Sequence, residues 1–189
     1  MNKQDSKIFS TVFVGMLAAM VYVVTLFRFP FLGSKVHFAN AVCLLSGMLL
    51  GPVLGGVAAG LGSALFDAFN GGYGIVEILI TFVSKFAMAW VCGLIMGAAG
   101  KRRMKLDRTV IASVAGALTY VALYMLKTFI YQRFVYGFPL DAVGVTMGSK
   151  LIPSLINAGV AVVAAPIFYH AVLPALRAGG ILKKLGTEE

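Results

Sequence analysis

Charged residues are scarce in this chain. Only 12% of its 189 residues are Asp, Glu, Lys or Arg, whereas a soluble globular domain carries about 25%. Hydrophobic residues make up 60% of the sequence, so too few polar side chains remain to cover a water-exposed surface. The composition excludes an ordinary soluble domain and indicates an integral membrane protein whose surface is solvated by lipid.

Residues for metal and nucleophile chemistry are also few. The chain has two histidines and two cysteines, without an H-E-x-x-H or C-x-x-C pattern, so we expect no catalytic metal site. The sequence at 97–102 lacks the spacing and the hydroxyl residue of a phosphate-binding G-x-x-x-x-G-K-[ST] loop. The sequence at 60–63 lacks the glycine that follows the serine in a hydrolase nucleophile turn. We therefore expect no catalytic residue, no metal and no cofactor.

Long apolar runs fill most of the sequence. A helix needs about 20 apolar residues to cross a bilayer. The pair Gly51-Pro52 and the triplet Asn70-Gly71-Gly72 break the apolar pattern and separate neighbouring runs. We predict one all-α membrane domain over residues 1–189, with six transmembrane helices at about residues 9–27, 37–50, 53–69, 75–99, 110–130 and 145–172.

Basic residues cluster in three segments of the sequence. Lys3 and Lys7 precede the first run, five Lys or Arg residues lie within 101–108, and three more lie within 177–184. Six spans place all three segments on one side, which the positive-inside rule makes cytoplasmic, so both termini are predicted to be cytoplasmic. The same clustering accounts for the net charge of +9, and no basic stripe interleaved with exposed aromatics indicates nucleic-acid binding.

Small residues recur every four positions on two of the predicted helices. In lipid, such residues allow helix backbones to approach closely. This spacing is compatible with packing inside the chain and with a docking surface for a partner protein, and the sequence leaves both readings open. The candidate docking residues are Gly15 and Ala19 on the first helix and Gly55 and Ala59 on the third.

Polar and ionisable side chains recur in the outer half of the predicted bundle. Ionisable groups within a membrane are energetically costly, which makes each one a candidate for function. Several share a helix face, because they are spaced by three or four residues. Together they predict a polar pocket that opens outwards, is lined by aromatic rings and suits a small, flat, hydrogen-bonding ligand. The candidate substrate-binding residues are His37, Asn40, Asp67, Glu77, Lys85, Tyr120, Tyr124, Lys127, Lys150, Ser154 and Asn157.

Some of these residues also have a structural interpretation. Lys127 and Lys150 lie close enough to the outer boundary to extend towards the headgroups. His37 can end a helix in the headgroup zone, and Asp67 can end a helix beside a lysine. Lys85 lies near the midplane, too deep to reach water easily, which favours a functional or ion-paired role.

Several stretches of the chain resemble the substrate-binding (S) components of energy-coupling-factor (ECF) vitamin transporters. They are VHFANAV at 36–42, LLGPVLGG at 49–56 and LGSALFD at 61–67, and the similarity continues through 81–85 and 153–157. The block from Gly51 to Asp67 is the most specific part. The most similar branch is the one associated with hydroxymethylpyrimidine, pyridoxine and related cofactor precursors.

This resemblance implies a vitamin site near the outer surface of the cell membrane, six helices with cytoplasmic ends, and no covalent catalysis. It also implies two kinds of partner, a transmembrane coupling protein (EcfT-type) and two ABC ATPases (EcfA-type). In the family, an A-x-x-x-A motif on the first helix contacts the coupling protein. Gly15 and Ala19 match these positions as a small-residue variant.

The sequence departs from that branch at Lys127, where an acidic residue is expected. With Lys85 and Lys150, this lysine makes the pocket more basic and predicts a ligand with a carboxylate or phosphate-like group, or an electron-rich heterocycle. We therefore expect an S component for hydroxymethylpyrimidine or a vitamin B6 form, or alternatively for a carboxylate-bearing vitamin. A small membrane enzyme acting on a lipid-linked substrate is an alternative of another class, although the chain lacks a D-x-x-D-type pair. A non-transporting scaffold is the third reading.

Overall fold

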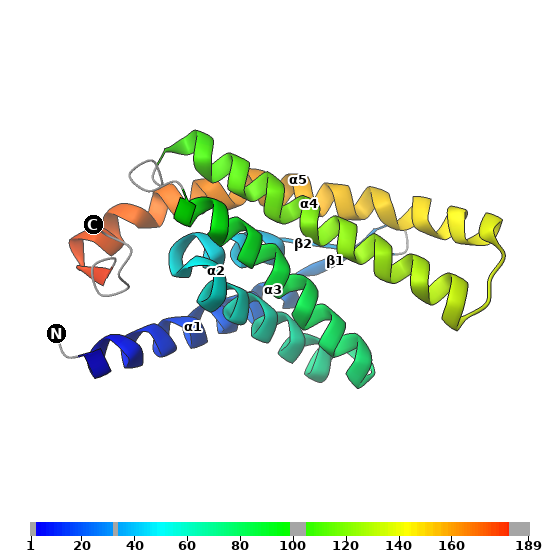
Figure 1. Cartoon of the computed structure of the whole chain (residues 1–189), viewed down its shortest axis with the longest axis horizontal. Coiled ribbons are helices and arrows are strands. Elements are labelled where there is room, and N and C mark those ends of the chain that lie inside the picture. The colour runs from blue at the N-terminus through cyan, green and yellow to red at the C-terminus, as the bar shows by residue number, and fades with distance from the viewer. Residues whose placement is uncertain (1–2, 32–33, 99–104, 182–189) are drawn as a thin grey trace.

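The computed structural model describes residues 3–31, 34–98 and 105–181 (Figure 1). Long helices dominate this part of the chain, and one short β-hairpin follows the first helix. The elements in chain order are α1 (Lys3–Leu26), β1 (Arg28–Phe31), β2 (Ser34–His37), α2 (Ala39–Phe66), η1 (Asp67–Gly71), α3 (Ile75–Ala98), α4 (Leu106–Ile130), η3 (Tyr131–Val135) and α5 (Leu140–Ala178).

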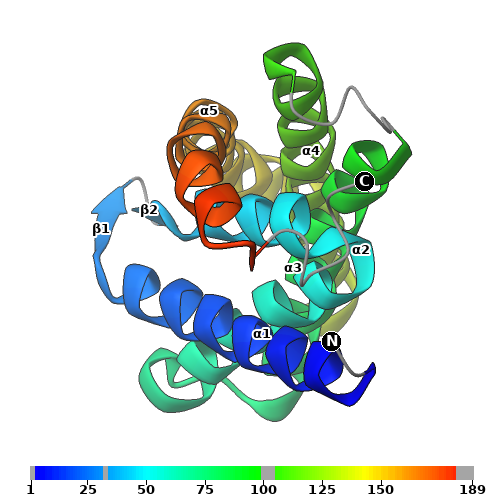
Figure 2. The same cartoon turned by 90° about the vertical axis from the view of Figure 1, so that its left-hand side faces the viewer.

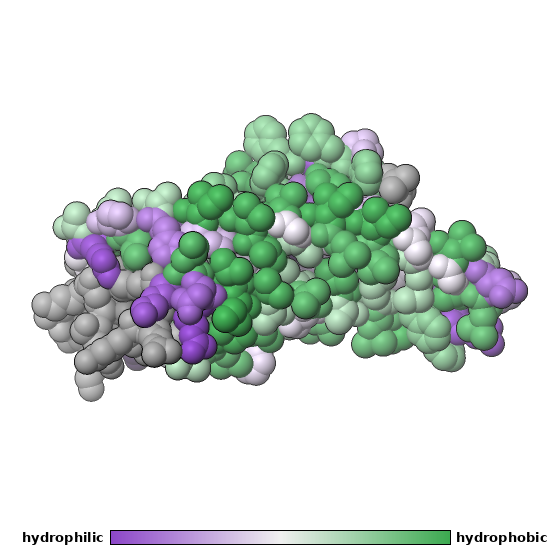
Figure 3. Space-filling model, turned by 90° about the horizontal axis from the view of Figure 1, so that it is seen from above, coloured by the Kyte–Doolittle hydropathy of each residue, from purple (hydrophilic) through white to green (hydrophobic). Residues whose placement is uncertain are grey.

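The outer surface of the helices is apolar. Within the described residues, five helices are long and apolar enough to cross a membrane. Large apolar side chains are exposed along them, for example Val12 on α1, Leu79 on α3 and Val163 on α5. Figure 3 shows hydrophobic residues over the middle of the molecule and hydrophilic residues towards its two ends. The chain is thus an all-α, multi-pass membrane protein.

Helix α2 contains two of the predicted spans and turns back on itself between them. Gly51 has φ 77° and ψ −172°, which is not helical, and Pro52 follows it without a backbone N–H. The Ser46 hydroxyl donates to the Gly55 carbonyl at 2.9 Å, although nine residues of straight helix span about 13 Å. Figure 1 shows α2 reversing direction. Five elements of spanning length are therefore described instead of six, and the six-span count stays a prediction.

The segment between α1 and α2 is a β-hairpin. β1 and β2 pair antiparallel, with Arg28 opposite His37 and Phe31 opposite Ser34. The sequence indicated a loop here and placed His37 at the start of the second helix, whereas α2 begins at Ala39. Two strands of four residues carry a weak local signal, and a two-stranded hairpin needs outside contacts to be stable.

Close backbone packing holds the helices together. Gly47 lies against the Ala89 carbonyl of α3, and Gly62 lies against the Ala18 carbonyl of α1, so neither position has room for a Cβ atom. In Figure 2 the start of α2 lies between α1 and the pair α4 and α5. The start of α1 and the end of α5 lie at the same end of the molecule (Figure 1). Their placement on the cytoplasmic side stays a prediction.

Candidate substrate-binding site

A cavity of about 340 Å³ lies between the hairpin and the helices. The structure brings ten of the eleven candidate binding residues to its wall, and the eleventh, Asn40, is buried behind it against Lys85. These residues come from β2, η1, α3, α4 and α5. The ten that line the cavity are His37, Asp67, Glu77, Lys85, Tyr120, Tyr124, Lys127, Lys150, Ser154 and Asn157.

Lys85 is a buried cation in the cavity wall. Its side chain is 4% exposed, its Nζ donates to Asn40 Oδ1, and Nζ lies 3.6 Å from the centre of the Tyr120 ring. Within the described residues, no carboxylate lies within ion-pairing distance of this ammonium group. A neutral amide oxygen and an aromatic face compensate only part of the desolvation of a buried charge. Lys85 therefore retains attraction for an anionic or electron-rich group in the cavity.

Other cations in the cavity wall also lie over aromatic rings. Arg28 stands 4.6 Å from the ring centre of Phe66, and Lys127 Nζ stands 5.4 Å from that of Tyr131. Tyr120 and Tyr124 stack with ring centres 6.1 Å apart and 18° between their planes, which gives the cavity a flat wall. The lining basic residues are Arg28, Lys35, Lys85, Lys127 and Lys150, and the lining acidic residues are Asp67 and Glu77.

Sequence reasoning missed Arg28 and Lys35 as lining residues. Both belong to the hairpin, in the segment between the first two predicted helices, which the sequence indicates as an outer loop. Two basic residues in an outer loop run against the positive-inside trend. That exception is the signal that could have identified them.

Asn157 of α5 holds the hairpin in place. Its Oδ1 accepts a hydrogen bond from the His37 backbone N–H at 2.9 Å, and its Nδ2 donates to the Lys35 carbonyl at 2.8 Å. Asn157 is 6% exposed, and both ends of its carboxamide bond the backbone of β2. This geometry shows a positioning contact, through which α5 orients the side chains of β2 towards the cavity.

The His37 ring is uncharged near neutral pH. Burial and, to a smaller extent, the positive charges of Lys85, Arg28 and Lys35 together lower the pKa of its imidazole from 6.5 to about 3. Its Nδ1 is buried without a hydrogen-bond partner, and so is Oε1 of Gln132, a lining residue of η3 that sequence reasoning also missed. Gln132 lies four residues after Thr128, another lining residue, and this helical spacing could have indicated it.

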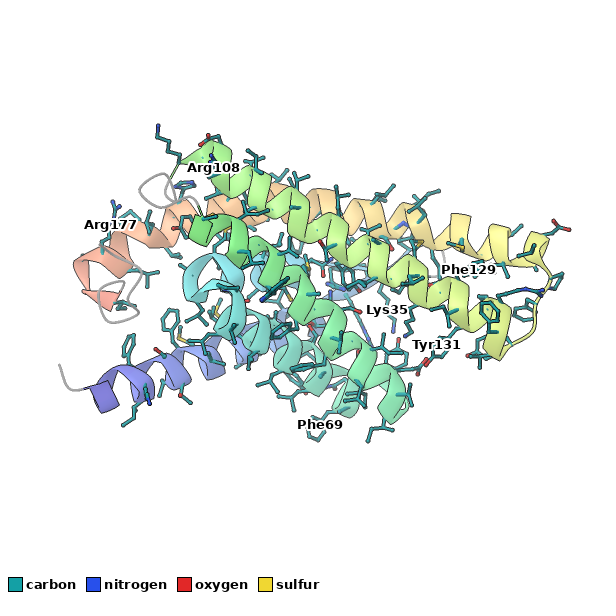
Figure 4. The ribbon with its side chains drawn as sticks, in the orientation of Figure 1. Lys35, Phe69, Arg108, Phe129, Tyr131 and Arg177 are labelled. Atoms are coloured by element: carbon teal, nitrogen blue, oxygen red, sulfur yellow. The ribbon has the colours of Figure 1, made fainter. Side chains whose placement is uncertain are left out.

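Figure 4 shows where the labelled side chains lie. Lys35 and Tyr131, which both line the cavity, lie near each other in this view. Arg108 and Arg177 lie at the opposite end of the molecule, beside the ends of α4 and α5. The basic residues of the cavity are therefore separate from the basic residues at that end.

The four candidate docking residues divide into two environments. Gly15 and Ala19 lie on the exposed side of α1, and a Cβ atom at Gly15 would meet nothing within 4 Å. Gly55 and Ala59 are buried, and a Cβ atom at Gly55 would lie 2.5 Å from the Ser46 carbonyl oxygen. The small residues of the third predicted helix therefore pack inside the chain.

The described residues contain no group of three or more His, Cys, Asp and Glu side chains that could hold a metal ion. The cavity instead combines donors, cations and flat rings, which is an arrangement for binding a small polar molecule.

Residues 5–173 match the family of the ECF-type riboflavin transporter, S component. The chain belongs to this family. Comparison with individual curated proteins found no match.

Membership fixes the general role of this S component. It is the substrate-binding subunit of an ECF-type importer and not an enzyme, so the membrane-enzyme alternative is wrong. S components work with the EcfT coupling protein and the EcfA ATPases. The family match supports the sequence resemblance at this level and does not confirm the finer assignment to the hydroxymethylpyrimidine and pyridoxine branch.

Proposed function

We propose that the protein captures a small water-soluble vitamin or cofactor precursor in this cavity from the outer side of the cell membrane. It then presents the ligand to an EcfT-type coupling protein driven by two EcfA-type ATPases. The observation that carries the proposal is the convergence of ten candidate residues from five elements on one cavity. Its volume of about 340 Å³ lies at the small end of the usual range for ligand sites. A hydroxymethylpyrimidine or vitamin B6 form is the leading substrate.

Native mass spectrometry of the detergent-purified protein, with identification of released small molecules, tests this function. We expect one bound vitamin or precursor per chain. Thermal-shift assays with hydroxymethylpyrimidine, pyridoxine, riboflavin and nicotinate then rank the substrate classes. A protein that carries no small molecule and is stabilised by none of these compounds contradicts the proposal and favours the scaffold reading.

An anionic, carboxylate-bearing vitamin is the second candidate, because five basic residues line the cavity against two acidic ones. Lys127→Gln removes one of these charges and keeps a polar side chain. We expect nicotinate, or a co-purified anionic ligand, to bind at least about tenfold more weakly, since a hydrogen bond to a charged group contributes about 1.5–3 kcal/mol. Isothermal titration calorimetry measures the change.

Arg133→Gln is the matched control for Lys127→Gln. Arg133 is exposed in η3, the turn that follows the α4 helix of Lys127, and it does not line the cavity. Arg133→Gln removes one positive charge from the region without removing a lining group. The affinity for the same ligand is therefore expected to stay within about twofold, as for an exposed and screened charge. Equal affinities of the two variants for a carboxylate probe would remove the support for an anionic ligand.

A further inference from the structure

Two buried polar atoms of the described residues have no hydrogen-bond partner, and both belong to residues that line the cavity. They are His37 Nδ1 and Gln132 Oε1. More than about 90% of buried polar groups in proteins are hydrogen-bonded, because an unpaired one loses its hydrogen bonds to water without replacement. The position of both exceptions at one cavity indicates that a bound molecule supplies the missing partners.

The surroundings of the two side chains explain why neither finds a partner within the chain. The His37 backbone is fixed by the Asn157 carboxamide, which holds the ring beside the cavity. Gln132 lies in η3, a π-helical turn that continues α4. Such turns occur often at functional sites. The backbone therefore places both residues at the cavity, where each keeps one buried polar atom without a partner in the described part of the chain.

The chemistry of these atoms differs from that of the lysines. Lys and Arg can only donate hydrogen bonds, so they select acceptors and anions. A Gln carbonyl oxygen can only accept, so the ligand group opposite Gln132 must be an N–H or an O–H. The His37 ring, being neutral, offers one N–H and one lone pair and so matches a donor or an acceptor of a heterocycle.

We propose that His37 and Gln132 form the neutral part of the recognition surface, so that the substrate carries a hydrogen-bond donor as well as an electron-rich or anionic group on a flat ring. This inference rests on the proposed function and narrows its substrate class. Lys85, Lys127 and Lys150 attract the electron-rich or anionic group. The tyrosine rings contact the faces of the heterocycle, and Gln132 selects the edge that bears the donor.

Two matched pairs of probes test the inference in the purified full chain by calorimetry. One pair is 6-aminonicotinate and nicotinate, and the other is 4-amino-5-hydroxymethyl-2-methylpyrimidine and the same compound without its amino group. In at least one pair we expect the member with the donor to bind about tenfold more tightly, as for a net hydrogen bond of about 1.4 kcal/mol.

Variants of Gln132 test whether this residue causes the preference for the probe with the donor. Gln132→Met, similar in shape and without the amide, is expected to bring the affinity ratio of the pair close to one. Gln132→Glu keeps an acceptor and is expected to keep the ratio, even where its charge weakens both probes. His37→Phe is expected to weaken both members. Ser149→Ala, an exposed change on α5 outside the cavity wall, serves as the control.

The results distinguish a failure of this inference from a failure of the proposed function. If probes bind and neither pair shows a preference, or if the preference persists in Gln132→Met, the inference is wrong and the proposed function stands. If His37→Phe binds both probes like the unchanged protein, the role assigned to His37 is wrong. If native mass spectrometry finds no bound small molecule and no probe binds, the inference is overturned together with the proposed function.

Discussion

At the scale of single residues, Lys85 and Asn40 form the most informative contact of the site. A lysine that is 4% exposed, inside an apolar bundle, is held by one amide oxygen and one tyrosine ring. Pairing with a neutral amide leaves the positive charge in place, so the contact orients the ammonium group without neutralising it. The remaining N–H groups of Lys85 are thereby available to a ligand in the cavity.

Replacement of Lys85 is expected to affect stability and binding separately. Lys85→Met leaves Asn40 Oδ1 buried and unpaired, which lowers the free energy of unfolding by about 1–3 kcal/mol, and it also weakens ligand binding. The double variant Lys85→Met/Asn40→Leu removes both partners, so its melting temperature is expected to recover while binding stays weak. Thermal unfolding measures the change in stability, and calorimetry measures the change in ligand affinity.

Lys105→Met is the matched control, because Lys105 is exposed at the start of α4. Lys105→Met is expected to change neither the melting temperature nor the affinity for the ligand. A double variant that binds the ligand as tightly as the unchanged protein would show that Lys85 has a structural role only.

At the scale of elements, the hairpin and the turn within α2 shape the cavity. The hairpin is fixed to α5 through Asn157. Asn157→Leu breaks both of these hydrogen bonds, so we expect faster hydrogen exchange of the β2 amides and faster ligand dissociation. Asn157→Asp keeps the acceptor for the His37 N–H and is expected to give an intermediate exchange rate.

Gly159→Ala is the control for Asn157, because the space around Gly159 on the same helix is open. Gly159→Ala is expected to leave the hydrogen exchange of the β2 amides and the rate of ligand dissociation unchanged. If Asn157→Leu loses affinity without faster exchange in β2, Asn157 contacts the ligand directly and does not act through the hairpin.

The turn within α2 depends on the backbone of Gly51. A side chain at φ 77° and ψ −172° is strained by about 1–3 kcal/mol. Gly51→Ala is therefore expected to lower the melting temperature. Gly97→Ala, on an exposed helical position with open space, is expected to leave it unchanged or raise it slightly. Equal melting temperatures for the two variants would contradict the strain argument.

At the scale of the whole molecule, α1 offers an exposed face for a partner helix. Gly15 and Ala19 lie on this face among the exposed side chains of Val12, Met16 and Met20. Helices in lipid pack most closely where small residues face one another. We propose that the EcfT-type coupling protein contacts this face of α1.

Bulky residues on that face are expected to block assembly and to spare ligand binding. Gly15→Leu and Ala19→Leu fill the space needed for close helix contact, and neither residue lines the cavity. Co-purification with the EcfT and EcfA proteins is expected to fall strongly, while calorimetry of the isolated subunit gives unchanged affinity. Val12→Leu is the control, since it keeps a large apolar side chain. Normal co-purification of both leucine variants would place the contact elsewhere.

The sequence by itself determined that the surface of the protein faces lipid, and it indicated most of the candidate residues that line the cavity. Charge is too scarce for a water-exposed surface, and a polar residue within an apolar run stands out because lipid makes it costly. For this reason ten residues found at the cavity, Lys85 and Lys127 among them, were identifiable without coordinates. The same sequence also carried the resemblance that the family match supports.

Only the tertiary structure decided how these residues meet. Asn157 bonds residues 120 and 122 positions away, and no local pattern encodes such a contact. That contact places Lys35 of the hairpin at the cavity. The reversal at Gly51 likewise places Gly55 against Ser46, so that this candidate docking residue packs inside the chain, one of the two readings that the sequence left open. Spacing along a helix fixes which residues share a face, whereas the long-range contacts of the fold decide what that face meets.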